Sequence, residues 1–109
     1  MTFEGSWDDV FEALLLTVKE YPVVLIDKEK GVIDTDWLEF QKEKKRAKLN
    51  IKLKSIEEGI KIDISSHLEA QKSFLSKKWT PIKSDGKTEN SILKEVRDRL
   101  ELKVKENKE

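Results

Sequence analysis

Two stretches in the middle of the chain alternate between apolar and polar residues, and this alternation limits the possible folds more than any other feature. Residues 47–54 and 60–65 place an aliphatic side chain or alanine at every second position, with mostly lysine between them. Because successive strand side chains point to opposite faces, each stretch predicts a strand with one buried and one hydrated face. The intervening Glu57-Glu58-Gly59 predicts a tight turn between them. The apolar members are Ala47, Leu49, Ile51, Leu53, Ile60, Ile62 and Ile64.

A second hairpin is expected immediately before this one. Residues 23–27 are mostly β-branched or apolar, and residues 28–31 form a polar turn that ends in Gly31, a residue free to take positive φ. Residues 32–40 return as the partner strand. By alternation, Ile33, Thr35 and Trp37 share one face, which is that of the core, and Asp34 and Asp36 point to the other face. Trp7, Trp37 and Trp79 are all expected in the core or at its rim, and Trp79, beside Pro81 in the irregular region, is the best candidate for an exception.

Helices are expected at both ends. Ser6 can cap a first helix that ends at Tyr21-Pro22, because proline disfavours helical geometry in the preceding residue. A closing helix is expected from about Glu89, with residues 105–109 frayed. Residues 66–88 are expected to be irregular or rich in loops. The helical stripes consist of Trp7, Val10, Phe11, Leu14 and Val18 in the first helix, and Ile92, Val96, Leu100 and Val104 in the last.

These elements predict one α+β domain over residues 1–109. Its expected architecture is a four-stranded antiparallel sheet with the N- and C-terminal helices packed on one face, in the order α-β-β-β-β-α. The chain has 109 residues, of which 37% are hydrophobic and 40% charged, so one modest core is expected. It contains no cysteine, which excludes disulfides and thiolate chemistry within it. It also contains no apolar run of the roughly 18 residues that crossing a bilayer requires.

Charge is balanced overall but uneven along the chain. Residues 1–40 carry ten acids and three bases, whereas residues 41–54 carry seven bases and one acid. The formal net charge is zero, which argues against a dedicated nucleic-acid binder. The basic segment nevertheless supplies an alternative function, namely binding of nucleic acid or an anionic surface through residues 42–54. Its candidate residues are Lys42, Lys44, Lys45 and Arg46.

The sequence resembles the small envelope lipoprotein domains of the NlpB/DapX type, which are also called BamC-like. The resemblance lies in the helix over residues 7–18 that runs into Tyr21-Pro22-Val23-Val24, in the hairpin over residues 26–37, in the strand that starts at residues 46–49, and in the closing helix after Trp79 and residues 84–85. It implies a periplasm-facing, outer-membrane-associated domain, tethered through a lipid on an upstream cysteine and serving outer-membrane assembly. It implies no catalytic residues.

Catalytic patterns are weak in this chain. His67 is the single histidine, and it shares the expected polar face with Asp34, Asp36 and Asp63, while Glu69 follows it closely. Such a set can hold a metal or an acid–base pair, so a small metal-dependent enzyme around His67 is the third and weakest hypothesis. The chain has no His-x-x-x-His spacing, no Gly-x-Ser-x-Gly turn and no phosphate-binding loop.

The preferred expectation is a non-catalytic binding or assembly module that contacts another protein, without cofactor or metal. Trp79 and Pro81 are candidate contact residues because they lie in the irregular region, and Lys48, Lys52 and Lys54 because they lie on the hydrated sheet face. The expected location is the periplasm-facing envelope, with the cytoplasm as the alternative. The sequence specifies neither the partner nor the oligomeric state.

Overall fold

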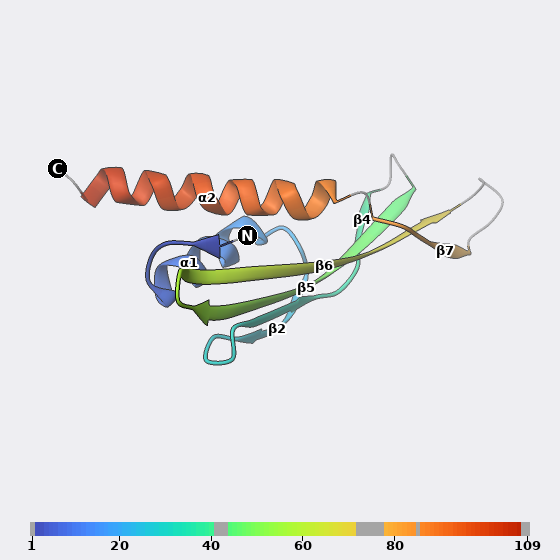
Figure 1. Ribbon diagram of the computed structural model, residues 1–109. Helices are drawn as coiled ribbons and strands as arrows, with labels where there is room; N and C mark the ends of the chain where they lie inside the picture. Colours follow the sequence, from blue (N-terminus) through green and yellow to red (C-terminus); the bar gives the residue numbers. More distant parts are fainter. Residues whose placement is uncertain (1, 41–43, 72–77, 85, 108–109) are drawn as a thin grey trace.

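The chain forms an antiparallel sheet accompanied by two helices. A computed structural model describes residues 2–40, 44–71, 78–84 and 86–107 (Figure 1). The α+β class, the two helices and the antiparallel sheet are confirmed, but the predicted four strands are wrong, because the described residues form seven. The elements are β1 (Thr2–Phe3), α1 (Trp7–Thr17), β2 (Val23–Asp27), β3 (Val32–Thr35), β4 (Leu38–Phe40), β5 (Lys45–Ile56), β6 (Gly59–Gln71), β7 (Trp79–Ile82) and α2 (Lys87–Asn107).

The additional strands arise because β5 and β6 form a hairpin of 12 and 13 residues, longer than any of its neighbours. The sheet order is β1-β6-β5-β3-β2, and β4 and β7 extend it along the far half of the hairpin. There β4 pairs with β5 and β7 pairs with β6. Figure 1 shows β4 and β7 beyond the N-terminal end of α2. The short β1 pairs with β6 near the opposite end, where Phe3 lies opposite Ile60.

The expected single strand over residues 32–40 is broken after Thr35. On β3, Asp34 lies opposite Asn50, whereas on β4, Leu38 lies opposite Ala47. The chain thus advances four residues on one side and three on the other, which inserts one extra residue and reverses the alternation. The prediction that Trp37 faces the core is therefore wrong. The extra residue turns its indole to the opposite face, beside Lys48.

The core lies between the helices and one face of the sheet. In α1, the Ser6 hydroxyl accepts a hydrogen bond from the Asp9 amide at 3.1 Å, as the predicted cap requires. Apolar stripes of both helices pack on the alternating residues of β5 and β6. Each fully buried aliphatic or aromatic side chain contributes about 1.5–3 kcal/mol. The buried cluster contains Phe3, Val10, Phe11, Ala13, Leu14, Val18, Ile33, Leu49, Ile51, Leu53, Ile60, Ile62, Ile92, Leu93 and Val96.

Residues 66–88 contain more regular structure than the sequence indicated. Strand β6 continues through Gln71, β7 follows at residues 79–82, and α2 begins at Lys87. Residues 72–77 and 85 lie outside the described residues. At the other end, α2 extends to Asn107, into the tail expected to fray, and residues 108–109 lie outside the description. Neither described helix is long and apolar enough to cross a membrane.

Candidate protein-binding face

The face of the sheet opposite the helices, here called the open face, has no described element over it. Residues paired across antiparallel strands point to the same face, so the register of β5 with β6 defines its members. Arg46, Lys48 and Asn50 alternate with the buried residues of β5. The cross-strand pairs of the open face are Arg46 with Glu69, Lys48 with His67, Asn50 with Ser65, Lys52 with Asp63, and Lys54 with Lys61.

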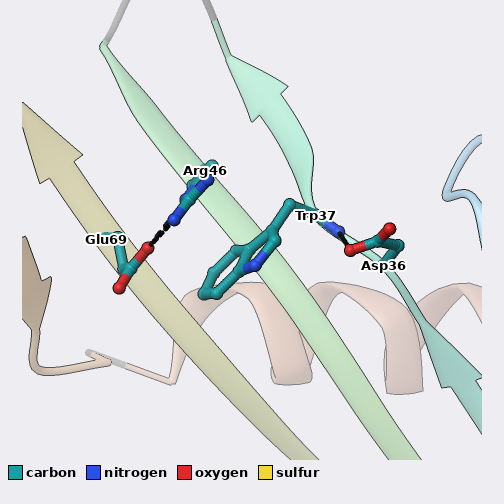
Figure 2. Close-up of polar contacts among 4 residues, drawn as sticks. All are labelled: Asp36, Trp37, Arg46 and Glu69. Atoms are coloured by element: carbon teal, nitrogen blue, oxygen red, sulfur yellow. Dashed lines mark hydrogen bonds and ion pairs between the residues drawn. The ribbon is translucent and has the colours of Figure 1, made fainter. Parts of the chain in front are cut away.

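Two tryptophans and an arginine form a compact cluster at the far end of this face. The guanidinium carbon of Arg46 lies 4.3 Å from the centre of the Trp37 ring and 4.5 Å from the centre of the Trp79 ring. Arg46 Nε donates a hydrogen bond to Glu69 Oε1 at 2.7 Å, and Nη2 contacts the same oxygen. Figure 2 shows Trp37 and Arg46 over β5, with the helix behind the sheet. We call Trp37, Arg46, Glu69 and Trp79 the tryptophan–arginine cluster.

Three strands and the residue before a fourth bring the cluster together. Trp37 precedes β4 and is held there by its own amide, which donates to Asp36 Oδ1 at 2.8 Å (Figure 2). Arg46 and Glu69 are direct cross-strand partners on β5 and β6. Trp79 begins β7, two residues before Pro81, which lies opposite Glu69. The cluster therefore depends on β4 and β7, the two strands that flank the far half of the hairpin.

The arginine is held in place and partly shielded from water. Its side chain is 22% exposed and that of Glu69 is 18% exposed, so the ion pair is screened less than a surface pair. Each arginine–aromatic contact contributes about 0.5–1 kcal/mol at exposed sites and more when it is desolvated. The guanidinium thus neutralises a half-buried carboxylate and is held beside two indoles in one conformation.

Two shallow hollows continue from the cluster across the open face. One has a volume of about 330 Å³ and is lined by residues that include Trp37, Lys48, His67 and Pro81. The other has a volume of about 450 Å³ and extends to Val24 at the edge of the sheet. Lys48 and His67 line both hollows, so the two are neighbours. Together they form a broad, uneven surface that suits a macromolecule better than an enclosed small molecule.

The residues considered for metal or acid–base chemistry do not converge. His67 is exposed on β6 opposite Lys48, and Glu69 is engaged by Arg46. The Asp34 carboxylate accepts a hydrogen bond from the Asn50 side chain. No group of three or more histidine, aspartate or glutamate side chains able to hold a metal ion occurs in the described residues.

The residues predicted to contact a partner do share one surface. Trp79 is half-buried in the cluster, and Pro81 is exposed two residues later on the same side of β7. Lys48, Lys52 and Lys54 are exposed along the open face. All five belong to the same side of the sheet, with Trp79 and Pro81 at one end and Lys54 towards the other.

The residues predicted to form an anionic-surface site are not gathered in this way. Lys42 lies outside the described residues. Lys44 is half-buried in a turn with a φ of 52°. Lys45 lies opposite Phe40 and Ala70, on the face opposite to Arg46. Arg46 itself is engaged by Glu69. The run of basic residues is therefore divided between the two sides of the sheet.

Sequence reasoning missed the roles of Trp37 and Glu69. The sequence suggests for Glu69 only a part in a metal site or an acid–base pair, and its ion pair with Arg46 depends on the register between residues 23 positions apart. For Trp37, an available signal was Asp36, since aspartate favours local hydrogen bonds to the backbone over regular strand pairing. Reading that residue as a strand breaker would have separated β3 from β4.

Comparison with known proteins places the chain in one family. The chain belongs to the family described as "Domain of unknown function (DUF3576)", whose model matches residues 7–101. The matched range starts at the first residue of α1, ends within α2 and includes the whole tryptophan–arginine cluster. No curated protein matches the chain.

Proposed function

We propose that this chain is a non-catalytic binding module that contacts another protein through its open face. The observation that carries the proposal is the tryptophan–arginine cluster, which places two indoles and a guanidinium on a sheet surface with no described element over it. Tryptophan and arginine are the residue types most enriched among those that dominate interface energies. The ion pair with Glu69 fixes the guanidinium before binding, which lowers the entropy lost on association.

The exposed lysines contribute to the same surface. Lys48 Nζ lies 5.6 Å from the centre of the Trp37 ring, next to the cluster. Charged groups around an aromatic centre are typical of an interface rim, where they favour complementary partners and speed association. The open face combines such a centre with several lysines, and Asp34 and Asp63 lie between these lysines. A partner with mixed charge and an acidic area near Lys48 fits this pattern.

The proposed cellular location is the bacterial envelope. Its support is the resemblance of the sequence to NlpB/DapX-type domains, together with the order of a helix, two hairpins and a closing helix. In this setting the chain is the soluble domain of a bacterial lipoprotein, periplasm-facing and associated with the outer membrane. Fractionation of cells that express the natural gene tests this part, and recovery in the cytoplasmic fraction alone contradicts it.

Photo-crosslinking tests the binding function. In one strain, the protein carries a photoreactive amino acid in place of Lys48. In a matched strain, it carries the same amino acid in place of Lys94, on the exposed side of α2. An adduct of defined mass is expected from position 48 and not from position 94. Adding Trp79→Ala, with folding checked by circular dichroism, is expected to remove the adduct. Equal adducts from both positions, or none from position 48, contradict the proposal.

A second candidate function, binding of single-stranded nucleic acid, has one observation in its favour. Trp37 lies on the open face beside Lys48, and aromatic side chains interleaved with basic ones are the pattern on which bases stack. Fluorescence anisotropy with labelled RNA and DNA oligonucleotides tests it. Salt-dependent binding that Trp37→Ala abolishes supports nucleic acid, and absence of binding at low salt eliminates it.

A further inference from the structure

Strand β2 is an exposed, apolar edge of the sheet. It lies at one end of the strand order and pairs with β3 alone among the described strands. Its three central residues are exposed and apolar: Val24 is 66% exposed, Leu25 47% and Ile26 53%. Edge strands expose unpaired backbone groups, and natural proteins usually blunt them with proline, lysine, a bulge or a very short strand. Within β2 itself there is no proline or lysine, and its register shift lies between Val23 and Leu25, so Leu25, Ile26 and Asp27 pair regularly with β3.

The opposite edge of the same sheet shows the contrast. There β1 has only two residues, and β7 has four, of which Pro81 has no amide hydrogen to donate. The proline and the short length protect that edge against further pairing. The difference between the two edges within one sheet argues that the apolar β2 edge serves an interaction.

The register of β2 with β3 shows which β2 side chains an added strand would contact. Ile26 lies opposite Ile33, on the side of the helices, and Leu25 lies opposite Asp34, on the open face. Between Val23 and Leu25 the register shifts, and Val24 borders the larger hollow of the open face. An incoming strand therefore meets Ile26 on one face and Leu25 on the other, so its alternate side chains have apolar neighbours on both faces, and main-chain pairing supplies affinity.

Charge distinguishes between a second copy of this chain and a different partner. Residues 20–36, which comprise β2 and its flanks, carry five acids and two bases. Asp34 and Asp36 line the hollow next to Val24. Pairing β2 with the β2 of a second copy brings two such acidic regions together, which costs free energy through like-charge repulsion. A partner strand with basic flanks gains attraction at the same place.

We propose that the β2 edge accepts, by strand addition, an extended segment of a different protein that has alternating apolar residues between basic flanks. This inference rests on the proposed binding function and specifies the form of the partner. It extends the interface from the open face around the edge, since the hollow that reaches Val24 also includes Lys48.

A pair of peptides tests the inference with the full chain. The probe is a fluorescein-labelled nine-residue peptide in which valine alternates with threonine between paired lysines, and its counterpart has glutamate in place of lysine. The basic peptide is expected to bind at least about tenfold more tightly than the acidic one. Slower amide exchange is expected in β2 and not in β7. Absence of binding at about 1 mM peptide, or slower exchange confined to β7, overturns the proposal.

Two variants serve as the matched pair. Ile26→Lys adds a charge to the edge, and Leu102→Lys adds the same charge to an exposed leucine of α2, which is 60% exposed. Ile26→Lys is expected to weaken binding at least about tenfold, and Leu102→Lys less than about twofold. Equal effects overturn the proposal, as does a dimer of the unmodified chain in sedimentation that Ile26→Lys dissociates.

If crosslinks from position 48 persist while the peptide fails to bind, the strand-addition proposal is wrong and the proposed binding function stands. Loss of both the crosslinks and the peptide binding refutes both proposals.

Discussion

The Thr35 hydroxyl accepts a hydrogen bond from the backbone amide of Leu49 at 2.8 Å, in the position where regular strand pairing would supply a carbonyl. Thr35 is 1% exposed and is the one buried polar residue in the part of the chain whose burial the structure describes. It lies where β3 leaves β5, one step beyond the pair of Asp34 and Asn50. The side chain thus satisfies the amide exposed by the break, and the break in turn places Trp37 on the open face.

Replacing Thr35 tests whether its hydroxyl takes the place of a backbone carbonyl as the acceptor for the Leu49 amide. Thr35→Val keeps the shape but leaves the Leu49 amide buried without its partner, so we expect a loss of about 1–3 kcal/mol in urea unfolding. Amide exchange at Leu49 should become faster. Thr35→Ser, which keeps the oxygen, is the control and should preserve protection of that amide. Equal protection in both variants would show that the hydroxyl is not the partner in solution.

The sequence predicted those parts of the fold that depend on local patterns. Alternation identified the β5–β6 hairpin and its buried face, and Ser6 with the stripe through Val10 and Leu14 identified α1. It did not predict the break that separates β4 from β3, or strand β7; β4 and β7 have three and four residues. Such strands carry too few residues to show a period, and they exist because the long hairpin offers them free edges.

The candidate site was predicted only in part for the same reason. Trp79, Pro81 and Lys48 were selected from their loop position and strand alternation, and they lie on one surface. The assignment of Trp37 to the core failed because alternation carries no information across an inserted residue. Predicting the pair of Arg46 and Glu69 requires the register of β5 with β6. The alternation of apolar residues does not define that register at the end of the hairpin far from its turn.

The ion pair in the tryptophan–arginine cluster should be strongly coupled. In a double-mutant cycle of Arg46→Leu and Glu69→Leu, we expect a coupling free energy of about 0.5–3 kcal/mol, because each single change leaves a half-buried charge without its partner. The control cycle uses Arg99 and Glu95, a pair on α2 that is separated by 3.5 Å and whose side chains are 36% and 51% exposed, more than those of the cluster pair. Such helix pairs contribute about 0.3–0.5 kcal/mol. Equal couplings measured by urea unfolding would contradict the geometry of the cluster.

Position 31 requires glycine both because its φ is positive and because neighbouring atoms leave no space for a Cβ. Its φ is 70°, and an added Cβ would lie 2.6 Å from Trp7 Cη2 and 2.8 Å from the Leu53 carbonyl oxygen. Gly86 has a similar φ of 81°, but its nearest neighbour, Asn90 Nδ2, is 3.8 Å away. Gly31→Ala should therefore destabilise the protein by about 1–3 kcal/mol more than Gly86→Ala, because overpacking adds to a shared backbone strain. Similar unfolding midpoints for the two variants would exclude the clash.

Tyr21, the one tyrosine of the chain, should titrate above the ordinary value. Burial raises the pKa of its phenol above 10.0, and the negative charges of Glu20 and Glu89 raise it further. Absorbance titration of the phenolate should therefore give a pKa above 10.0. Glu20→Gln should lower this pKa without restoring the ordinary value, because burial is the largest cause. Glu101→Gln, near the other end of α2 from Glu89, is the control and should leave the titration unchanged.

The same shift has a consequence for stability at alkaline pH. Because the folded-state pKa of Tyr21 is raised, the neutral phenol contributes stability that is complete below pH 10.0 and is lost as the pH rises through the folded-state pKa. Urea unfolding at several pH values should show a steeper alkaline loss for the unmodified chain than for Tyr21→Phe, which has no proton to release. Parallel loss in the two proteins, or titration of Tyr21 at or below 10.0, would contradict the burial of this side chain against the core.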